Sequence, residues 1–155
     1  FGFSPLELGL GSEFAVTGHT LVAANENAAI LAGGLTNFSG EAPLDALVEI
    51  SFEEPQISAR ETRLSHPRAW HRANLMRDGN ILFSAGLSSN FELATDLELF
   101  TPGETETETL AGELECGSIG LSTALLPDGS ILLLGGLTDE SGTLVLSPVA
   151  QLLSP

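Results

Sequence analysis

The sequence predicts an all-β protein built from three repeats of about 50 residues. Three segments of equal length align, and each contains a turn, a short apolar run and a terminal glycine: 19–34, 71–86 and 121–136. Their last residues, Gly34, Gly86 and Gly136, are spaced 52 and then 50 residues apart. The apolar runs are too short for helices and are bounded by turn residues, which favours strands. A fixed period of this length indicates a repeat array.

The first feature of each repeat is a hairpin. Asp78-Gly79 and Asp128-Gly129 stand at the turn in the second and third copies. This dipeptide suits a two-residue turn in which both central residues have positive φ. The first copy has Asn25-Glu26-Asn27 instead, and asparagine tolerates the same conformation. The apolar run after each turn has no polar alternation, so we expect a strand that is buried on both faces.

A pair of small residues follows this strand in every copy. The pairs are Gly33-Gly34, Ala85-Gly86 and Gly135-Gly136. A glycine in a strand pattern marks a position where another backbone approaches closely. We therefore assign structural roles in turns and pairs to these glycines: Gly33, Gly34, Gly79, Gly86, Gly129, Gly135 and Gly136.

Two further strands complete each repeat. The third strand is predicted at 47–52, 97–100 and 149–153, and Leu97 and Leu99 share one of its faces by alternation. The fourth strand is clearest at 104–110, where glutamate and threonine alternate strictly. A charged strand of this kind suits an outer edge that must not pair with other molecules.

Four antiparallel strands in a repeat of about 50 residues describe a β-propeller blade. The glycine pairs and the segment 97–102 resemble kelch-type β-propeller repeats, including the bacterial kelch-like type and the central domain of galactose oxidase. The resemblance covers nearly the whole chain. It implies a single domain, 1–155, with repeats at about 19–70, 71–120 and 121–155. The chain departs from the family in having no tyrosine and a single tryptophan, Trp70.

The two ends of the chain match each other. Phe3-Ser4-Pro5 corresponds to Leu153-Ser154-Pro155, at an offset of 150 residues. We expect the N-terminal strand, 1–18, to close a blade. Three blades are too few for a ring, because propellers have about four to eight. The blades are therefore completed by strand exchange with a second copy, by the second half of the same propeller, or in an open polymer.

Charge restricts the partners and the location. There are 21 acidic residues against 5 arginines and no lysine, and the net charge is −16. This balance argues against nucleic-acid partners, because phosphate binding needs a basic surface. No apolar run is long enough to cross a membrane, so no membrane insertion is expected. The acidity favours an extracellular or cell-surface protein, and the repeat type indicates a bacterial one.

The arginines are clustered in one stretch. All five lie within eighteen residues, together with two histidines: Arg60, Arg63, Arg68, Arg72, Arg77, His66 and His71. One interpretation is an anion-binding patch, because arginine binds carboxylates and sulfates with a two-pronged fork. Its members would be Arg60, Arg63, Arg68, His71 and Arg72. The other is that these arginines neutralise the acidic edges of neighbouring blades or of a second copy. His19 and His71 occupy equivalent positions, so we expect a ring nitrogen to bond a backbone carbonyl across blades.

Enzyme chemistry finds little support in the residues. A Schiff base needs lysine, and the sequence has no nucleophile elbow. The copper radical chemistry of galactose-oxidase relatives needs tyrosine ligands. We therefore expect no catalytic residue, no metal and no cofactor. The predicted function is a non-catalytic binding and assembly module whose rim loops, 35–46, 87–95 and 137–147, contact a protein or glycan. The alternatives are a fragment of a larger propeller enzyme and a structural subunit of an extracellular strand-donation polymer.

Overall fold

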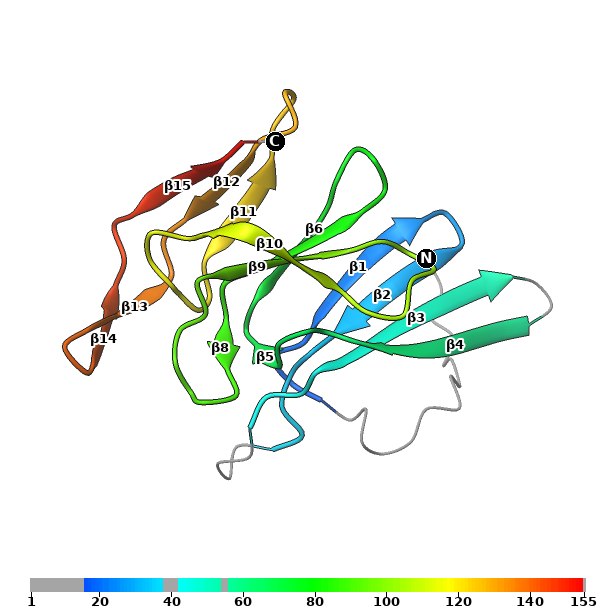
Figure 1. Ribbon diagram of the computed structural model, residues 1–155, viewed down its shortest axis with the longest axis horizontal. Coiled ribbons are helices and arrows are strands. Elements are labelled where there is room, and N and C mark those ends of the chain that lie inside the picture. Colours follow the sequence, from blue (N-terminus) through cyan, green and yellow to red (C-terminus); the bar gives the residue numbers. More distant parts are fainter. Residues whose placement is uncertain (1–15, 38–41, 54–55, 155) are drawn as a thin grey trace, which may run out of the picture.

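The computed structural model describes residues 16–37, 42–53 and 56–154 of the chain. Within these residues it contains β-strands and no helix, in three successive antiparallel sheets that we call blades 1 to 3 (Figure 1). Blade 1 is hydrogen-bonded in the order β1 (Thr20–Asn25), β2 (Ala28–Ala32), β3 (Ala46–Glu53) and β4 (Gln56–Arg63). The predictions of an all-β chain and of antiparallel sheets of four strands are confirmed.

Blades 2 and 3 repeat this order of strands. Blade 2 consists of β6 (Arg72–Leu75), β7 (Ile81–Ser84), β9 (Asp96–Phe100) and β10 (Glu108–Glu113). Blade 3 has three strands among the described residues, β11 (Ser122–Leu125), β12 (Ile131–Leu134) and β15 (Ala150–Leu153). Strand β6 contacts both β1 and β11, so the first strand of each blade faces a shared inner side. The predicted closing strand at 1–18 falls mostly outside the described residues.

Two small ribbons lie at one rim of the blades. They pair β5 (Arg68–Ala69) with β8 (Leu87–Ser88), and β13 (Leu137–Glu140) with β14 (Thr143–Leu146). The same bridge occurs in every copy, between the residue two positions before the aligned segment and the residue after the glycine pair. It joins Thr17 to Leu35, Ala69 to Leu87 and Ile119 to Leu137. The three copies therefore share their geometry at this rim.

The blades are held together by two apolar cores. Between blades 1 and 2, Ile30 and Leu47 pack against Ile81, Phe83 and Phe100. Between blades 2 and 3 the core contains Leu82, Leu97, Leu121, Ile131 and Leu133. Strand β7 supplies alternate residues to both cores, and all four of its residues are buried, as predicted for the strand after the turn. The equivalent β12 departs from this prediction, because its Leu134 is 52% exposed. Each buried core side chain contributes about 1.5–3 kcal/mol through its burial.

The hairpin turn of the second copy differs from the prediction, whereas the first copy has a two-residue loop between Asn25 and Ala28. The Gly79 N–H donates to the Met76 carbonyl at 3.2 Å, and the Met76 N–H donates to the Asn80 carbonyl at 2.7 Å. These bonds enclose a loop of three residues, in which only Gly79 has a positive φ, of 88°. A type I turn followed by a left-handed glycine has this form. The two-residue prediction was wrong because the Asp78 carboxylate accepts the Asn80 N–H at 3.1 Å and holds a turn with ordinary φ.

The fourth strand of blade 2 also begins later than predicted. It starts at Glu108, whereas the alternating sequence suggested a start at Glu104. Residue Glu106 instead forms a bridge to Arg63 of blade 1, and Thr107 is buried with 7% exposure. The alternation therefore does not mark one continuous edge strand, because part of it lies against the neighbouring blade.

Candidate functional site

The predicted arginine patch is distributed along the contacts between blades. Arg60 donates to the carbonyls of Gly103 and Glu104 in blade 2, at 2.9 and 2.8 Å. Arg63 pairs with Asp45 at 2.7 Å within blade 1. Arg72 and Arg77 of blade 2 donate to carbonyls of the third repeat, those of Leu121 and Pro127 respectively. Four of the five arginines thus bond atoms of the following repeat: Arg60, Arg68, Arg72 and Arg77.

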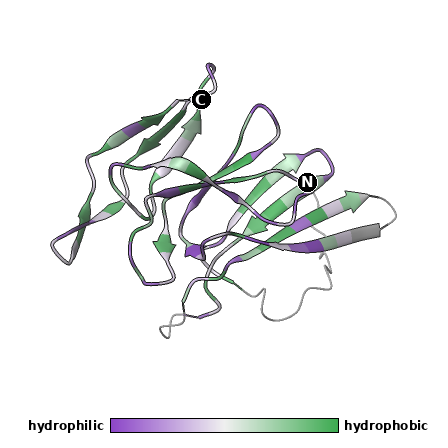
Figure 2. Cartoon of the chain, viewed as in Figure 1, coloured by the Kyte–Doolittle hydropathy of each residue, from purple (hydrophilic) through white to green (hydrophobic). Residues whose placement is uncertain are grey.

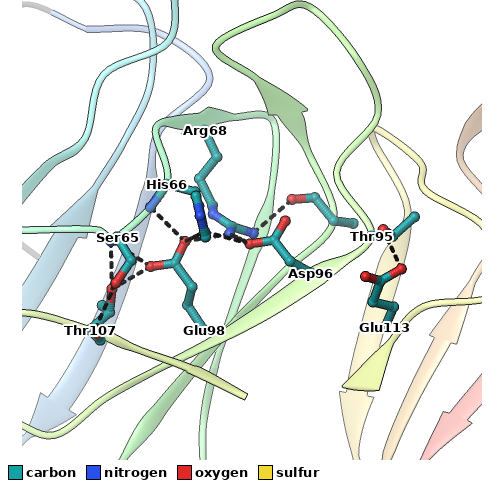
Figure 3. A network of polar contacts seen from close by, with 9 residues as sticks. Ser65, His66, Arg68, Thr95, Asp96, Glu98, Thr107 and Glu113 are labelled. Atoms are coloured by element: carbon teal, nitrogen blue, oxygen red, sulfur yellow. Dashed lines mark hydrogen bonds and ion pairs between the residues drawn. The ribbon is translucent and has the colours of Figure 1, made fainter. Parts of the chain in front are cut away.

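Arg68 is the centre of a buried polar network (Figure 3). Its side chain is 1% exposed and pairs with Glu98, which is fully buried, and with Asp96 at 2.6 Å. Both acids lie on β9 of blade 2, whereas Arg68 belongs to the segment that leads from blade 1 into blade 2. A buried charge needs a partner of opposite sign and hydrogen bonds to its remaining polar atoms. The network supplies the opposite charges across the connection between the two blades, whereas the buried Nε of Arg68 has no hydrogen-bond partner among the described residues.

Glu98 also fixes the backbone that precedes Arg68. Its carboxylate accepts the N–H groups of Ser65 and His66, at 2.8 and 3.1 Å, and the hydroxyl of Thr107. The Ser65 hydroxyl donates to the Thr107 carbonyl at 2.8 Å. The arrangement connects the linker that follows β4 with β9 and with the residue before β10. The sequence prediction missed Ser65, Asp96, Glu98 and Thr107, although a glutamate on the same strand face as Phe100 is a usable sign of a buried acid.

Three side chains of this network also meet the distance requirement for a metal site. The ligand atoms of His66, Asp96 and Glu98 lie within 4.8 Å of one another. However, the two carboxylate oxygens that lie near His66 Nδ1 are also bonded by the Arg68 guanidinium. These oxygens are Asp96 Oδ2 and Glu98 Oε1. A metal ion would have to displace a buried cation that is already paired. The chemistry of the cluster therefore fits a structural clamp better than a metal centre.

His71 lies in the contact between blades 1 and 2. It is 1% exposed, and its Nε2 is 2.8 Å from the Thr20 hydroxyl on β1. Its partner across the blades is thus a side-chain hydroxyl, where a backbone carbonyl was predicted. Burial, followed by the charges of Arg68 and Arg72, lowers the pKa of His71 from 6.5 to about 3. The equivalent His19 is exposed.

The lowered pKa predicts a pH-dependent loss of stability. Below pH 6.5 the unfolded chain binds a proton at residue 71 that the folded chain refuses until about pH 3. The free energy of unfolding therefore falls by about 1.4 kcal/mol per pH unit in this window. We expect His71→Leu, which copies Leu121 of the third repeat, to lose this component. Urea unfolding at pH 6.5 and 5.0 would show a drop about 2 kcal/mol larger in the unaltered chain. Identical drops in the two proteins would contradict the assignment.

The predicted rim loops form a second candidate site. Residues 35–37 and 42–46 of the first loop are described, and 38–41 lie outside the described residues. The second and third loops contain β8 and the β13–β14 hairpin. Two pockets of about 450 and 500 Å³ open at this rim, and Ile119 lines both. The first lies against the β13–β14 hairpin, and the second lies between the second and third loops. Trp70 lines the first pocket, a role that the sequence prediction also missed.

Comparisons with known proteins identify similar folds and no related sequence family. The sequence matches no protein-family model and no curated protein. Among the solved structures that match is a fungal alcohol oxidase of the AA5 family, solved in complex with copper. It has a TM-score of 0.67 and 16% identity, over 79% of this chain and 27% of that chain. Another is YjhT, with a TM-score of 0.63 and 17% identity, over 85% of this chain and 45% of that chain.

Both of these structures are β-propellers. The chain has a β-propeller fold. It spans about a quarter of the length of the oxidase and less than half of the length of YjhT. The described residues contain no helix with the length and hydropathy needed to cross a membrane.

Proposed function

We propose that the chain is a non-catalytic binding and assembly module. In this proposal its blades associate with further propeller blades, and its rim loops contact a protein or glycan partner outside the cell. The observation that carries the proposal is the apolar sheet face of blade 3 that points away from blade 2.

This face follows from the alternation along β12. Ile131 and Leu133 point into the core shared with blade 2, so Leu132 and Leu134 point the other way. Leu134 is 52% exposed and pairs with Ala150 on β15. Leu152, which pairs with Leu132, is 58% exposed. Figure 2 shows β12 as strongly hydrophobic. An apolar sheet face of this kind is typical of an interaction surface.

The remaining surfaces support association with another blade. The two buried interfaces show what this fold places on such a face, namely a neighbouring sheet whose alternate residues interdigitate with it. Blade 1 exposes Leu21, at 62%, on the side opposite to its core residue Val22. Blade 3 has no fourth strand among the described residues, so a strand donated from another copy would have an edge of β15 to join.

The alternative is that the chain forms part of a larger propeller enzyme. The likeness to the fungal alcohol oxidase over 27% of that protein is compatible with this alternative. The blade 3 face would then contact further blades of the same polypeptide. A structural subunit of a strand-donation polymer would use the same face in an open array.

A pair of alanine variants tests the role of this face. Ala150→Asp places a charge on the apolar face, whereas Ala111→Asp places one on an exposed position of β10 in blade 2. We expect sedimentation velocity to show complexes with Ala111→Asp and mostly single chains with Ala150→Asp, because burying an unpaired charge is costly. Equal sedimentation of the two variants would refute the proposed face. Far-ultraviolet circular dichroism would verify that both variants fold.

A further inference from the structure

The rim of blades 2 and 3 carries a groove made of two adjoining pockets. Trp70, Leu137 and Leu146 line the first pocket, and Phe91 and Leu144 line the second, on either side of Ile119. Leu137 pairs with Leu146, and Asp139 pairs with Leu144, so these side chains share one face of the β13–β14 hairpin. Much of this apolar surface is open to solvent, with Phe91 50%, Leu144 52% and Leu146 83% exposed.

The backbone holds Trp70 at this groove under strain. Its φ is 52°, a left-handed value that is rare for a bulky residue. The first and third repeats have Gly18 and Gly120 at the same position, with φ of 68° and 69°. The indole lies against Gly18, where an added Cβ would be 2.9 Å from Nε1. The chain thus keeps a strained tryptophan where its other repeats have glycine, and strain of this kind collects at functional sites.

The second pocket adds negative charge to the apolar walls. Glu92 and Asp139 line it, and the Asp139 carboxylate accepts the Gly142 N–H at 2.9 Å. The chain has five cationic side chains besides histidine, and each donates to a group elsewhere: Arg60, Arg63, Arg68, Arg72 and Arg77. A cation that pairs with Glu92 and Asp139 would therefore come from a partner. A second copy of this chain would bring arginines engaged in the same contacts.

We propose that this rim groove binds a peptide segment of a protein partner in which an arginine or lysine stands close to a large apolar side chain. The apolar side chain enters the pocket beside Trp70 and Leu146. The cation enters the second pocket, between the two carboxylates and the face of Phe91, where both charge and the aromatic ring attract it. The net charge of −16 also steers a basic segment toward the protein. This inference rests on the proposed function, because it specifies the partner that the rim loops contact.

The single tryptophan of the chain is a built-in reporter for this groove. The probes are acetyl-Gly-Leu-Arg-Leu-Arg-Gly-amide and the same peptide with glutamate in place of both arginines, each titrated while Trp70 emission is recorded. We expect a saturable change with the arginine peptide and none with the glutamate peptide. In the double variant Glu92→Gln/Asp139→Asn, which keeps the side-chain shapes, the affinity should fall about tenfold. The control Glu61→Gln/Glu108→Gln removes the same charge from exposed strand positions and should bind like the unaltered chain.

Other results would overturn the inference. Equal binding of the two peptides would exclude a cation-selective groove. If both double variants bound the arginine peptide with equally lowered affinity, the loss would be due to net charge and not to the two carboxylates of the groove. A response of Trp70 to a neutral oligosaccharide, with none to the arginine peptide, would assign the groove to a glycan and leave the proposed function standing. A response to protein concentration alone would assign it to a second copy. The sedimentation test of Ala150→Asp does not involve this groove, so its outcome is independent.

Discussion

The substitution Glu98→Gln is expected to lower the free energy of unfolding by about 3–5 kcal/mol, the cost of breaking a buried ion pair from one side. Glu98 is fully buried and Arg68 is 1% exposed. The variant leaves the guanidinium with Asp96 as its remaining acidic partner. It also weakens the acceptor of the Ser65 and His66 N–H groups, which order the linker into blade 2. Equilibrium unfolding in urea would measure the loss.

Two further variants separate the ion pair from general effects of the substitution. Glu108→Gln changes an exposed glutamate on β10, and we expect a change within about 0.5 kcal/mol. The double variant Arg68→Met/Glu98→Gln removes both charges and keeps an acceptor for the Ser65 and His66 N–H groups. It should be more stable than Glu98→Gln, because no buried guanidinium is left with only one of its two acidic partners. If Glu98→Gln cost no more than Glu108→Gln, the network would not be the clamp between blades 1 and 2.

The substitution Gly33→Ala is expected to destabilise the protein by about 3 kcal/mol, since it combines overpacking with a left-handed backbone. A Cβ at this position would stand 2.1 Å from the Arg68 carbonyl oxygen and 2.9 Å from Cε1 of His71. The carbonyl itself accepts the Gly34 N–H at 2.9 Å, so it has little freedom to move. The loss would appear as a lower midpoint of thermal or urea unfolding.

The repeats supply a matched control for this variant. Gly135 occupies the same position in the third copy with a φ of 73°, and a Cβ there would meet only the Ser147 carbonyl oxygen, at 4.0 Å. Ala85 fills the position in the second copy with a φ of 58°. We therefore expect Gly135→Ala to cost about 1 kcal/mol, from the backbone conformation alone. A similar loss in both variants would mean that conformation, and not the approach of Arg68, determines the effect.

The repeat pattern made the fold predictable. The 52- and 50-residue spacing of Gly34, Gly86 and Gly136 located the equivalent strands. Alternation placed Leu97 and Leu99 on one face, and the structure shows that this face packs against blade 3. Details that depend on side-chain hydrogen bonds were less accessible. The Asp78 carboxylate accepts the Asn80 N–H and so stabilises a three-residue loop where a two-residue turn was predicted. Thr107 lies outside the edge strand in which it was predicted, because its hydroxyl donates to Glu98.

The candidate sites were harder to predict because they combine residues from different repeats. The arginines drew attention as a cluster in sequence, yet Arg60 and Arg68 take separate partners in blade 2. The partners are not conspicuous, since Glu98 is one acid among 21. Trp70 was the one residue of the groove that the sequence could have indicated, because alignment of the repeats places it at the position of Gly18 and Gly120. Its significance depends on φ and on the neighbouring loops, which the sequence does not reveal.

The most direct test of the assembly proposal is the mass of the unaltered chain in solution, by light scattering over a range of concentrations. Moderate salt is needed, because a net charge of −16 opposes association at low ionic strength. The single chain has a mass of 16.1 kDa. The proposal predicts a complex of at least twice this mass that forms as concentration rises. A folded species that stays at 16.1 kDa at every concentration would contradict self-assembly through the blade 3 face.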